Sequence, residues 1–405
     1  MEKKIVSEST LSFQYDEAAY EMAHEYPTYY RALGLEPRSQ HPFGMYDGTM
    51  RQPDLIRDAL QVVPETAKRI AEAVKDMAFN KVLITGLGSS YQLGAEIVYL
   101  VWGLLGIPAE LIESSEALLS DSIYDFENAL VIGLSSSGNT IETVEHLKQA
   151  KAAGAYTLAF TNTENTRLTN AAHDFFVSPG GYGLIYDFTS RYAPIVVVLS
   201  EIAKAKGCSR NKIDIVLKAL TEIPEQMQQA IDQMDKKCQY LGEWIRRDMC
   251  SVTIPASGNM LPISWEMALR FEEMAHFPGR GRPLIDFLHG GVGHIAPDVM
   301  TIVLAPQGKT YEYAERTVNV ARTIKAPCIA VIDANDHGGI VSQADQIIRI
   351  PQTHHLLKPM LYILAAQLIP YYTEVARPGG NPDAQRTDQP NYARAFDIAM
   401  PPKSH

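Results

Sequence analysis

The stretch Val131-Ile-Gly-Leu-Ser-Ser-Ser-Gly-Asn-Thr140 decides how the chain is organised. It continues an apolar run that begins at Ala129, and such a run is typical of a strand buried in a parallel sheet. Helical spacing of apolar residues resumes at Ile141, so the hydroxyl-rich segment lies between a strand and a helix. A helix N-terminus presents free N–H groups and the positive end of a dipole, which together bind anions. Capping needs only one hydroxyl, so four of them favour a phosphate site.

Composition and charge narrow the classes of function. The 405 residues are 46% hydrophobic, and 36 Lys and Arg against 47 Asp and Glu give a formal net charge of −11. This charge argues against nucleic acid and anionic membranes as partners, but a locally positive site could still bind a phosphorylated small molecule. The four cysteines lack CxxC spacing, no signal peptide is visible, and the apolar run Ile195–Leu199 is far too short to span a membrane. We therefore expect a cytoplasmic protein.

Apolar strand patterns alternate with helical patterns along most of the chain, which predicts an α/β fold with parallel sheets covered by helices on both faces. The predicted strands of the first half are Lys81–Thr85, Ala109–Glu113, Ala129–Leu134, Tyr156–Phe160 and Asp174–Val177. Those of the second half are Ser251–Pro255, Val299–Ala305, Ile329–Asp333 and Gln346–Ile350. The predicted helices include Leu93–Leu104, Tyr192–Lys204 with Pro194 in its first turn, Tyr311–Thr323 and Met360–Tyr371.

These patterns divide the chain into five parts. We expect an N-terminal extension (1–49), a first α/β domain (50–210), a helical linker (211–248), a second α/β domain (249–376) and an irregular tail (377–405). The extension should hold a short helix near Asp16–Leu33 and either pack across a partner subunit or remain loosely attached. The first domain should open with a helix starting at Met50-Arg-Gln-Pro53 and a second helix over Thr66–Met77.

The turn Gly86-Leu-Gly-Ser-Ser-Tyr91 follows another predicted strand, so its serines should meet the first serine cluster at the carboxyl edge of the sheet. Tyr91 stands where a dinucleotide fingerprint needs a third glycine, and no P-loop pattern is present. The adjacent His354 and His355 would point to opposite faces of an extended chain, which favours packing or solvation over a metal site. We expect no cofactor and no metal.

A second group of chemically active residues lies in the second half. Glu266, Arg270 and Glu273 recur at i, i+4 and i+7 on one helix face, and this spacing alone favours a solvated, ion-paired surface. His289 follows, before Gly290-Gly291, on a predicted loop between apolar residues. A carboxylate and an imidazole can move protons near neutral pH, as the isomerisation of an opened sugar requires.

From about Gly48 the chain resembles the tandem sugar isomerase (SIS) fold, and most closely the isomerase half of the glutamine:fructose-6-phosphate amidotransferases. The motifs that carry the resemblance are Met50-Arg-Gln-Pro53, Gly88-Ser-Ser-Tyr91, Ser114-Ser-Glu116, Leu134-Ser-Ser-Ser-Gly-Asn-Thr140, Glu266-Met-Ala-Leu-Arg270 with Glu273, His289-Gly290 and Asp388-Gln-Pro-Asn-Tyr-Ala-Arg394. The sixteen-residue separation of Glu273 and His289 is the most specific of these features. The resemblance implies two flavodoxin-like SIS domains.

The resemblance also implies roles for individual residues. Glu273 would carry a proton between C1 and C2 of a sugar 6-phosphate, supported by Glu266 and Arg270. His289 would assist ring opening from the neighbouring subunit, which implies a homodimer. The tail would contribute Arg394, where the family has an imine-forming lysine and arginine is a poor substitute. The residues implied in binding the phosphorylated substrate are Ser89, Ser90, Ser135, Ser136, Ser137 and Thr140, although the family has Gln at the position of Ser136.

Three functions remain open. The first is an enzyme of carbohydrate-derivative metabolism that acts on amino-sugar or fructosamine 6-phosphates, as an isomerase related to glucosamine 6-phosphate and fructose 6-phosphate, a deaminase or a deglycase. No glutaminase nucleophile is visible, so we do not expect glutamine dependence in this chain. The second is a regulatory sugar-phosphate sensor, which would not need Glu273 and His289. The third is a plain aldose–ketose phosphate isomerase, which could use the same pair.

Overall fold

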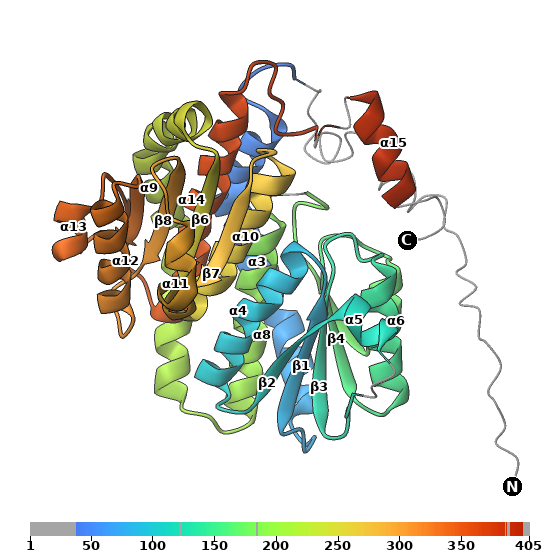
Figure 1. The fold of residues 1–405 in the computed structure, drawn as a ribbon. Coiled ribbons are helices and arrows are strands. Elements are labelled where there is room, and N and C mark those ends of the chain that lie inside the picture. The colour runs from blue at the N-terminus through green and yellow to red at the C-terminus, as the bar shows by residue number, and fades with distance from the viewer. Residues whose placement is uncertain (1–37, 121–123, 184, 385, 387–388, 400–405) are drawn as a thin grey trace, which may run out of the picture.

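The computed structural model describes the chain apart from residues 1–37, 121–123, 184, 385, 387–388 and 400–405. The helix expected near Asp16–Leu33 and the tail residue Asp388 lie outside the described residues. Figure 1 shows two α/β halves, each with its own sheet.

The two sheets have the same topology, which confirms the predicted tandem α/β fold. The first sheet has the order β2-β1-β3-β4-β5 and the second has β10-β9-β8-β6-β7, and every pairing is parallel. Read from β7 to β10, the strand order of the second sheet is the same as that of the first sheet read from β2 to β5. Both orders match the flavodoxin-like 2-1-3-4-5 arrangement. The strands are β1 (Lys81–Gly86), β2 (Ala109–Glu113), β3 (Ala129–Leu134), β4 (Tyr156–Thr161), β5 (Asp174–Val177), β6 (Ser251–Ala256), β7 (Gly279–Pro283), β8 (Val299–Ala305), β9 (Cys328–Asp333) and β10 (Gln346–Ile350).

One hydrophobic core joins the inner faces of both sheets. Long helices fill the space between them: α3 (Gly44–Val74), α4 (Ser89–Leu104), α8 (Asp187–Ala205), α9 (Arg210–Asp248), α10 (Leu261–Glu273) and α14 (Pro359–Val375). Along β1, Val82 and Ile84 face this shared core, whereas Leu83 between them faces a separate outer core. This alternation follows from the period of two in a strand. The segment predicted as a helical linker is α9, a helix packed against α14 and α3.

Shorter helices cover the outer faces. In the first half these are α5 (Ser114–Leu119), α6 (Ile141–Ala152) and α7 (Arg167–Ala171). In the second half they are α11 (Leu284–Gly290), α12 (Tyr311–Ile324) and α13 (Gly339–Gln343), with short 3-10 turns at Gly258–Met260, Gly291–His294 and His355–Leu357. No helix in the described part of the chain is long and apolar enough to cross a membrane.

Three helix starts differ from the prediction. Helix α4 begins at Ser89, inside the predicted turn, and not at Leu93. The expected pair of helices at Met50 and Thr66 is a single helix, α3, which begins at Gly44 and contains Pro53 and Pro64. Its first N–H groups, of Gly44 and Met45, donate to the carboxylate of Asp383 at 2.8 and 2.9 Å. The side chain that caps the start of α3 is therefore 339 positions away in the sequence, so the local sequence could not reveal where the helix begins.

The start of α8 matters more for function. This helix begins at Asp187, five residues before the predicted start at Tyr192, so Pro194 lies in its second turn and not its first. Nearly all of α8 is buried, including the polar residues of its extra first turn. The additional turn adds Asp187 and Arg191 to the core beside the first sheet.

Four further segments differ from the prediction. The missed strand β7, Gly-Arg-Gly-Arg-Pro, pairs with β6 at the edge of the second sheet and has no strand-like pattern. His289 lies at the end of helix α11 and not on a loop, and the tail contains helix α15 (Pro390–Ala399). The rings of His354 and His355 lie 4.3 Å apart in a turn, so they contact each other and do not point to opposite faces.

Candidate active site at the junction of the two halves

The two serine-bearing segments lie side by side at the carboxyl edge of the first sheet. β1 and β3 are neighbours, and the segments that follow them bring Ser90 and Ser135 to the same edge. Gly88, just before α4, has a φ of 52°, and Gly138 in the second segment has a φ of 68°. A Cβ on Gly138 would lie only 2.3 Å from the Thr166 hydroxyl, so both backbone conformation and space require glycine there.

The second segment, Ser135–Thr140, gathers hydroxyl groups and is called the serine loop below. The hydroxyl of Ser135 lies 2.8 Å from that of Thr140 and accepts the N–H of Gly138 at 3.1 Å. Ser137 accepts the N–H of Asn139 at 3.2 Å. Thr140 occupies the N-cap position of α6, but its side chain makes no capping hydrogen bond. Simple capping therefore does not explain this cluster, whereas a helix start with converging hydroxyls suits an anion.

Strand β4 and the residue after it hold the backbone of the serine loop. The carbonyl oxygen of Ser136 accepts hydrogen bonds from the Thr161 hydroxyl and the Asn162 N–H, both at 3.0 Å. The Asn162 side chain is buried and donates to Ser190 on α8 at 2.9 Å. The conformation of the loop is thus fixed by the protein's own backbone and side-chain contacts.

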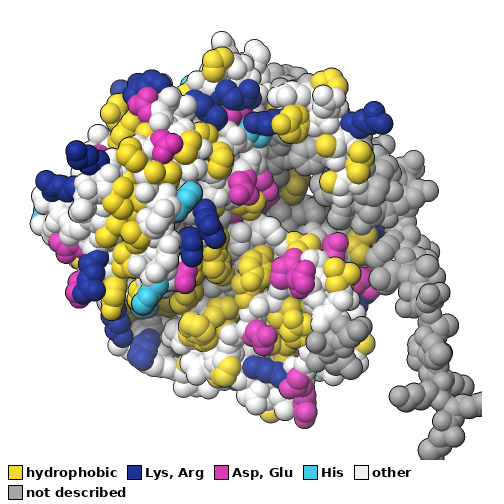
Figure 2. All heavy atoms as spheres, viewed as in Figure 1, with side chains coloured by type: hydrophobic (Ala, Val, Ile, Leu, Met, Phe, Trp, Pro, Cys, Tyr) yellow, Lys and Arg dark blue, Asp and Glu magenta, His cyan; other side chains and the backbone are white. Residues whose placement is uncertain are grey.

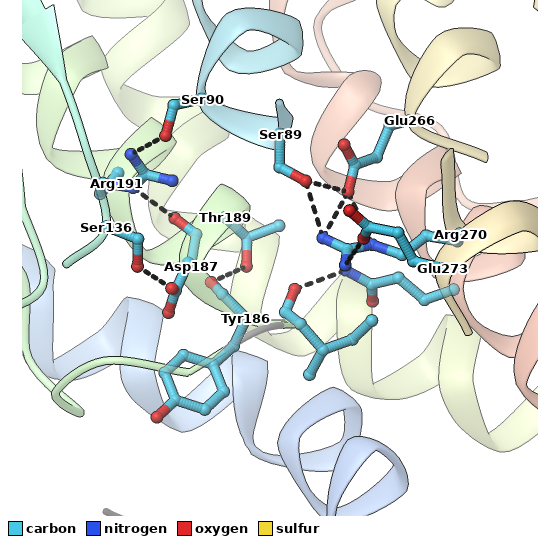
Figure 3. Close-up of polar contacts among 12 residues, drawn as sticks. Ser89, Ser90, Ser136, Tyr186, Asp187, Thr189, Arg191, Glu266, Arg270 and Glu273 are labelled. Atoms are coloured by element: carbon cyan, nitrogen blue, oxygen red, sulfur yellow. Dashed lines mark hydrogen bonds and ion pairs between the residues drawn. The ribbon is translucent and has the colours of Figure 1, made fainter. Parts of the chain in front are cut away.

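The first turn of α8 contacts both serine-bearing segments. Arg191 donates a hydrogen bond of 2.8 Å to the hydroxyl of Ser90, and Ser136 donates to the carboxyl of Asp187 (Figure 3). The other Asp187 oxygen accepts the N–H of Gly183 at 3.0 Å. Burial raises the pKa of Asp187 to about 8, against the opposing effects of Arg191, the Gly183 N–H and Arg270. Burial also lowers the pKa of Arg191.

Helix α10 of the second half faces these segments with the predicted Glu266, Arg270 and Glu273 (Figure 3). Arg270 bonds Glu266 at 2.6 Å and Glu273 at 3.3 Å, and it also donates to Ser89 of the first half at 2.9 Å. Ser89 in turn donates to Glu266 at 3.1 Å. The side chains of Glu266 and Arg270 are 0% and 4% exposed, so the solvated surface favoured by spacing alone is wrong for both.

Glu273 is half-buried and is the most accessible member of this group, with 38% of its side chain accessible. Figure 2 shows the surface hollowed between the two halves, with acidic side chains beside the hollow. Burial raises the pKa of Glu273, Arg270 lowers it, and the charges of Glu266 and Glu272 raise it. A carboxylate with a raised pKa that solvent can still reach is suited to accept and return a proton.

Sequence reasoning missed Asp187 and Arg191, and also Tyr182. Tyr182 precedes α8, and its pKa is raised to about 12 by burial and by the charges of Asp187 and Glu273. The sequence did contain a signal for these residues. Asp187 and Arg191 are opposite charges at i and i+4 just before the predicted apolar helix, and glycines flank Tyr182.

Two predicted residues make no hydrogen bond or ion pair with this site among the described residues. His289 is exposed at the end of α11, and among the described residues no hydrogen bond or ion pair joins it to Glu273. Arg394 is exposed on α15, which Figure 1 shows standing apart from the two halves. Their roles in substrate binding and ring opening stay predictions.

The equivalent edge of the second sheet holds a buried carboxylate. At the end of β9, Asp333 is fully buried and accepts the Gln307 N–H, which belongs to the loop after β8, at 2.9 Å. Asp333 also forms an ion pair with Lys358 and accepts the Tyr362 hydroxyl at 2.9 Å. The loop after β8 therefore donates an N–H to a carboxylate of the protein, whereas the loop after β3 gathers hydroxyl groups.

Comparisons with known proteins agree with this architecture. A glutamine–fructose-6-phosphate aminotransferase (isomerizing) from Pyrococcus horikoshii is 27% identical over 363 residues, covering 87% of this chain and 58% of that protein. The corresponding protein of Bacteroides thetaiotaomicron is 24% identical and covers 90% of this chain and 60% of the relative. The chain thus spans less than two thirds of the length of these relatives.

Solved structures support the fold alone, since their identities are below 25%. The C-terminal domain of glucosamine-fructose-6-phosphate aminotransferase from Francisella tularensis superposes with a TM-score of 0.74 at 18% identity, covering 83% of this chain and 97% of that one. Glucosamine-6-phosphate deaminase from Thermotoga maritima gives a TM-score of 0.58 at 19% identity, covering 82% and 97%. The SIS domain family matches residues 79–199 and 249–376, and the chain therefore belongs to the SIS domain family.

Proposed function

We propose that this chain is a phosphosugar enzyme that moves a proton between C1 and C2 of an amino-sugar or fructosamine 6-phosphate. The observation that supports this most is the position of Glu273, a carboxylate with a raised pKa, held by Arg270 at the junction with the half that carries the serine loop. The names of the relatives, which include a fructose-6-phosphate aminotransferase and a glucosamine-6-phosphate deaminase, support this substrate class.

In this proposal the serine loop and Ser90 bind the phosphate end of the substrate. The hydroxyls of Ser135, Ser137 and Thr140 and the free N–H groups of α6 would surround the phosphate oxygens. This anchors one end of an open-chain sugar and leaves the carbonyl end to reach α10. Anchoring at the non-reacting end supports catalysis because it positions the reacting carbons near the base.

Glu273 would then act as the base. Its carboxylate removes the proton from one carbon of the C1–C2 pair and returns it to the other, while the bond to Arg270 limits its rotation. General-base catalysis of this kind contributes about 10²- to 10⁴-fold to the rate. Arg270 also joins Glu273 to Ser89, so the base and the start of α4 share one hydrogen-bond network.

We also propose that His289 reaches the site of a second copy of the chain. It is exposed at the end of α11 and is not bonded to Glu273 of its own chain among the described residues. A homodimer in which each chain supplies His289 to the other would place an imidazole opposite each Glu273. The imidazole would open the sugar ring before proton transfer.

Proton exchange tests the proposal whatever the net reaction is. Glucosamine 6-phosphate, fructose 6-phosphate and fructosyl-amino acid 6-phosphates are each incubated with the protein in D₂O, and NMR follows deuterium entering C1 or C2. We expect exchange with at least one of them, and a loss of about 10²- to 10⁴-fold in Glu273→Gln.

The matched control is Glu272→Gln, a change of the neighbouring exposed glutamate, which should retain exchange. No exchange with any of these compounds, or equal exchange in Glu273→Gln and wild type, would refute the proposed chemistry. Release of ammonia or of a free amino acid during the same incubation separates a deaminase from a deglycase. Exchange and interconversion of the unsubstituted hexose phosphates alone would indicate a plain aldose–ketose isomerase.

A further inference from the structure

The first turn of α8 contains two charged residues that contact different parts of the proposed phosphate site. Asp187 and Arg191 are one helical turn apart, and both are almost completely buried, at 5% and 1% exposed. Asp187 accepts a hydrogen bond from Ser136 of the serine loop, and Arg191 donates one to Ser90 of the segment after β1. Arg191 also donates to the backbone oxygen of Asp187 at 2.9 Å, which fixes the guanidinium on this turn.

A carboxyl group next to a phosphate site needs an explanation. A phosphate monoester is a dianion above its second pKa of about 6, and an ionised Asp187 beside the serine loop would repel it. The serine hydroxyl that Asp187 binds could otherwise donate to the phosphate. Arg191 supplies the opposite charge beside Ser90, so this turn carries one group that attracts the ligand and one that repels it when ionised.

We propose that Asp187 and Arg191 are positioning residues that hold the two serine-bearing segments on one helical turn, and that Asp187 takes up a proton when a phosphorylated ligand binds. Protonated Asp187 can donate to the Ser136 oxygen, which frees the Ser136 hydroxyl proton for the phosphate. Arg191 stays charged and keeps Ser90 aimed at the ligand. This inference rests on the proposed phosphate site, and neither residue needs to touch the reacting carbons.

The surroundings of Asp187 support the assignment of the proton. Burial raises the pKa of Asp187 to about 8, so the free protein holds a mixture of both forms just above neutral pH. The charged or titratable groups around it are Arg191 and Tyr186 on α8, Tyr182 on the preceding segment and Arg270 on α10. Burial raises the pKa of Tyr182 to about 12 and also raises that of Tyr186, so neither phenol titrates between pH 7 and 9.

Isothermal titration calorimetry with fructose 6-phosphate tests the proposal, because this ligand has no amine to titrate. Binding is measured at pH 7.0, 8.0 and 9.0 in two buffers of different ionisation enthalpy, which counts the protons taken up. For wild type we expect uptake to approach one proton at pH 9, and the affinity to fall by up to about tenfold per pH unit above pH 8. In Asp187→Asn both effects should disappear.

Two further variants separate positioning from stability. Arg191→Lys keeps the charge but loses the planar fork, so we expect at least about tenfold weaker binding with the proton uptake unchanged. Thr189→Val removes a buried hydroxyl of the same turn that bonds Gln52 at 2.7 Å and neither serine-bearing segment. It should lower thermal stability without altering proton uptake.

The outcomes distinguish this inference from the proposed function. Binding of fructose 6-phosphate without proton uptake in wild type, or with uptake that persists in Asp187→Asn, overturns the inference and leaves the phosphate site intact. If neither fructose 6-phosphate nor glucosamine 6-phosphate nor a fructosyl-amino acid 6-phosphate binds to wild type, the proposed phosphate site and this inference are both overturned. Uptake that vanishes in Asp187→Asn and persists in Thr189→Val supports the inference.

Discussion

The guanidinium of Arg270 in the second half donates a hydrogen bond of 2.9 Å to the hydroxyl of Ser89 in the first half. Ser89 begins α4 shortly after the first strand, and Arg270 lies between two glutamates on α10. The candidate base, Glu273, is therefore positioned by a residue that also bonds the opposite half of the molecule. Loss of this guanidinium should affect both stability and chemistry, and the two effects can be measured separately.

The variant Arg270→Met leaves Glu266 as a buried carboxylate without its charge partner. We expect the free energy of unfolding in urea to fall by about 3–5 kcal/mol. Removal of the positive charge that lowers the pKa of Glu273 should also shift the acidic limb of the rate profile to higher pH. The control is Arg282→Met, which breaks an exposed pair with Asp286 and should cost less than about 1 kcal/mol. Unchanged stability in the Arg270→Met variant would contradict the arrangement described.

The wild-type pH profile of kcat/KM should have two limbs. Glu273 acts as a base only when ionised, so the rate should fall as the pH decreases through its raised pKa, above the ordinary value of 4.5. On the alkaline side the rate should fall through weaker substrate binding as Asp187 ionises near pH 8. The alkaline limb should appear in KM and not in kcat, which a full kinetic profile between pH 5 and 9 can show.

Mixing inactive variants tests whether the site spans two subunits. If each site combines Glu273 of one chain with His289 of another, a heterodimer of Glu273→Gln and His289→Ala holds one intact site. Random mixing makes half of the dimers hetero, so about a quarter of wild-type activity should return after joint refolding. Mixing Glu273→Gln with a chain that carries both Glu273→Gln and His289→Ala should restore no activity. Recovery of no activity in the first mixture would place His289 outside the partner's site.

The serine loop should tolerate no side chain at Gly138. Gly138→Ala combines a positive φ with a Cβ placed 2.3 Å from Thr166, so the loop must move. We expect KM for the phosphorylated substrate to rise at least about tenfold, with a smaller change in kcat. Gly154→Ala is the matched control, because it has a φ of 90° but open space around its Cβ. It should cost about 1 kcal/mol of stability and leave KM unchanged.

Glu96 on α4 should make stability depend on pH. Its carboxyl is fully buried, neither oxygen has a hydrogen-bond partner among the described residues, and burial raises its pKa well above the ordinary value of 4.5. The unfolded chain ionises above that ordinary value while the folded protein keeps Glu96 neutral. The stabilising contribution is therefore present at low pH and is lost, at about 1.4 kcal/mol per unit, as the pH rises toward the folded pKa.

Substitution of Glu96 checks this assignment. Glu96→Gln should flatten the pH dependence of urea unfolding, and Glu96→Leu should raise the melting temperature at pH 8 because it removes a buried polar group. Glu72→Gln, which changes a surface glutamate paired with Lys75, should leave the slope unaltered. A slope that is the same in wild type and Glu96→Gln would assign the pH dependence to another group.

Sequence patterns identified the sheet strands well because most of them are buried on both faces and are therefore largely apolar, as in β3 and β8. β7 was missed because it is an edge strand, where pairing with β6 and not side-chain burial determines the conformation. The start of α3 depends on Asp383, which lies far along the chain. Such long-range causes leave no local signal.

The site residues that cluster in the sequence could be predicted. The site residues whose role depends on burial in the folded protein could not. The hydroxyls of the serine loop and the spacing of Glu266, Arg270 and Glu273 are visible in the sequence, and the structure joins the last three through hydrogen bonds. Spacing alone could not reveal that Glu266 and Arg270 are buried at the junction of the halves. Asp187 was missed because the predicted helix began one turn too late.

The ion pair of Asp333 with Lys358 has a consequence for stoichiometry. Duplicated halves with two open edges could bind two ligands per chain and couple them within one polypeptide. At the second edge the Gln307 N–H, the Tyr362 hydroxyl and the Lys358 ammonium are already bonded to Asp333. We expect titration with a sugar phosphate to end at one ligand per chain. The second half would then supply the base, and the first half would bind the phosphate, so two halves with the same fold would have different roles.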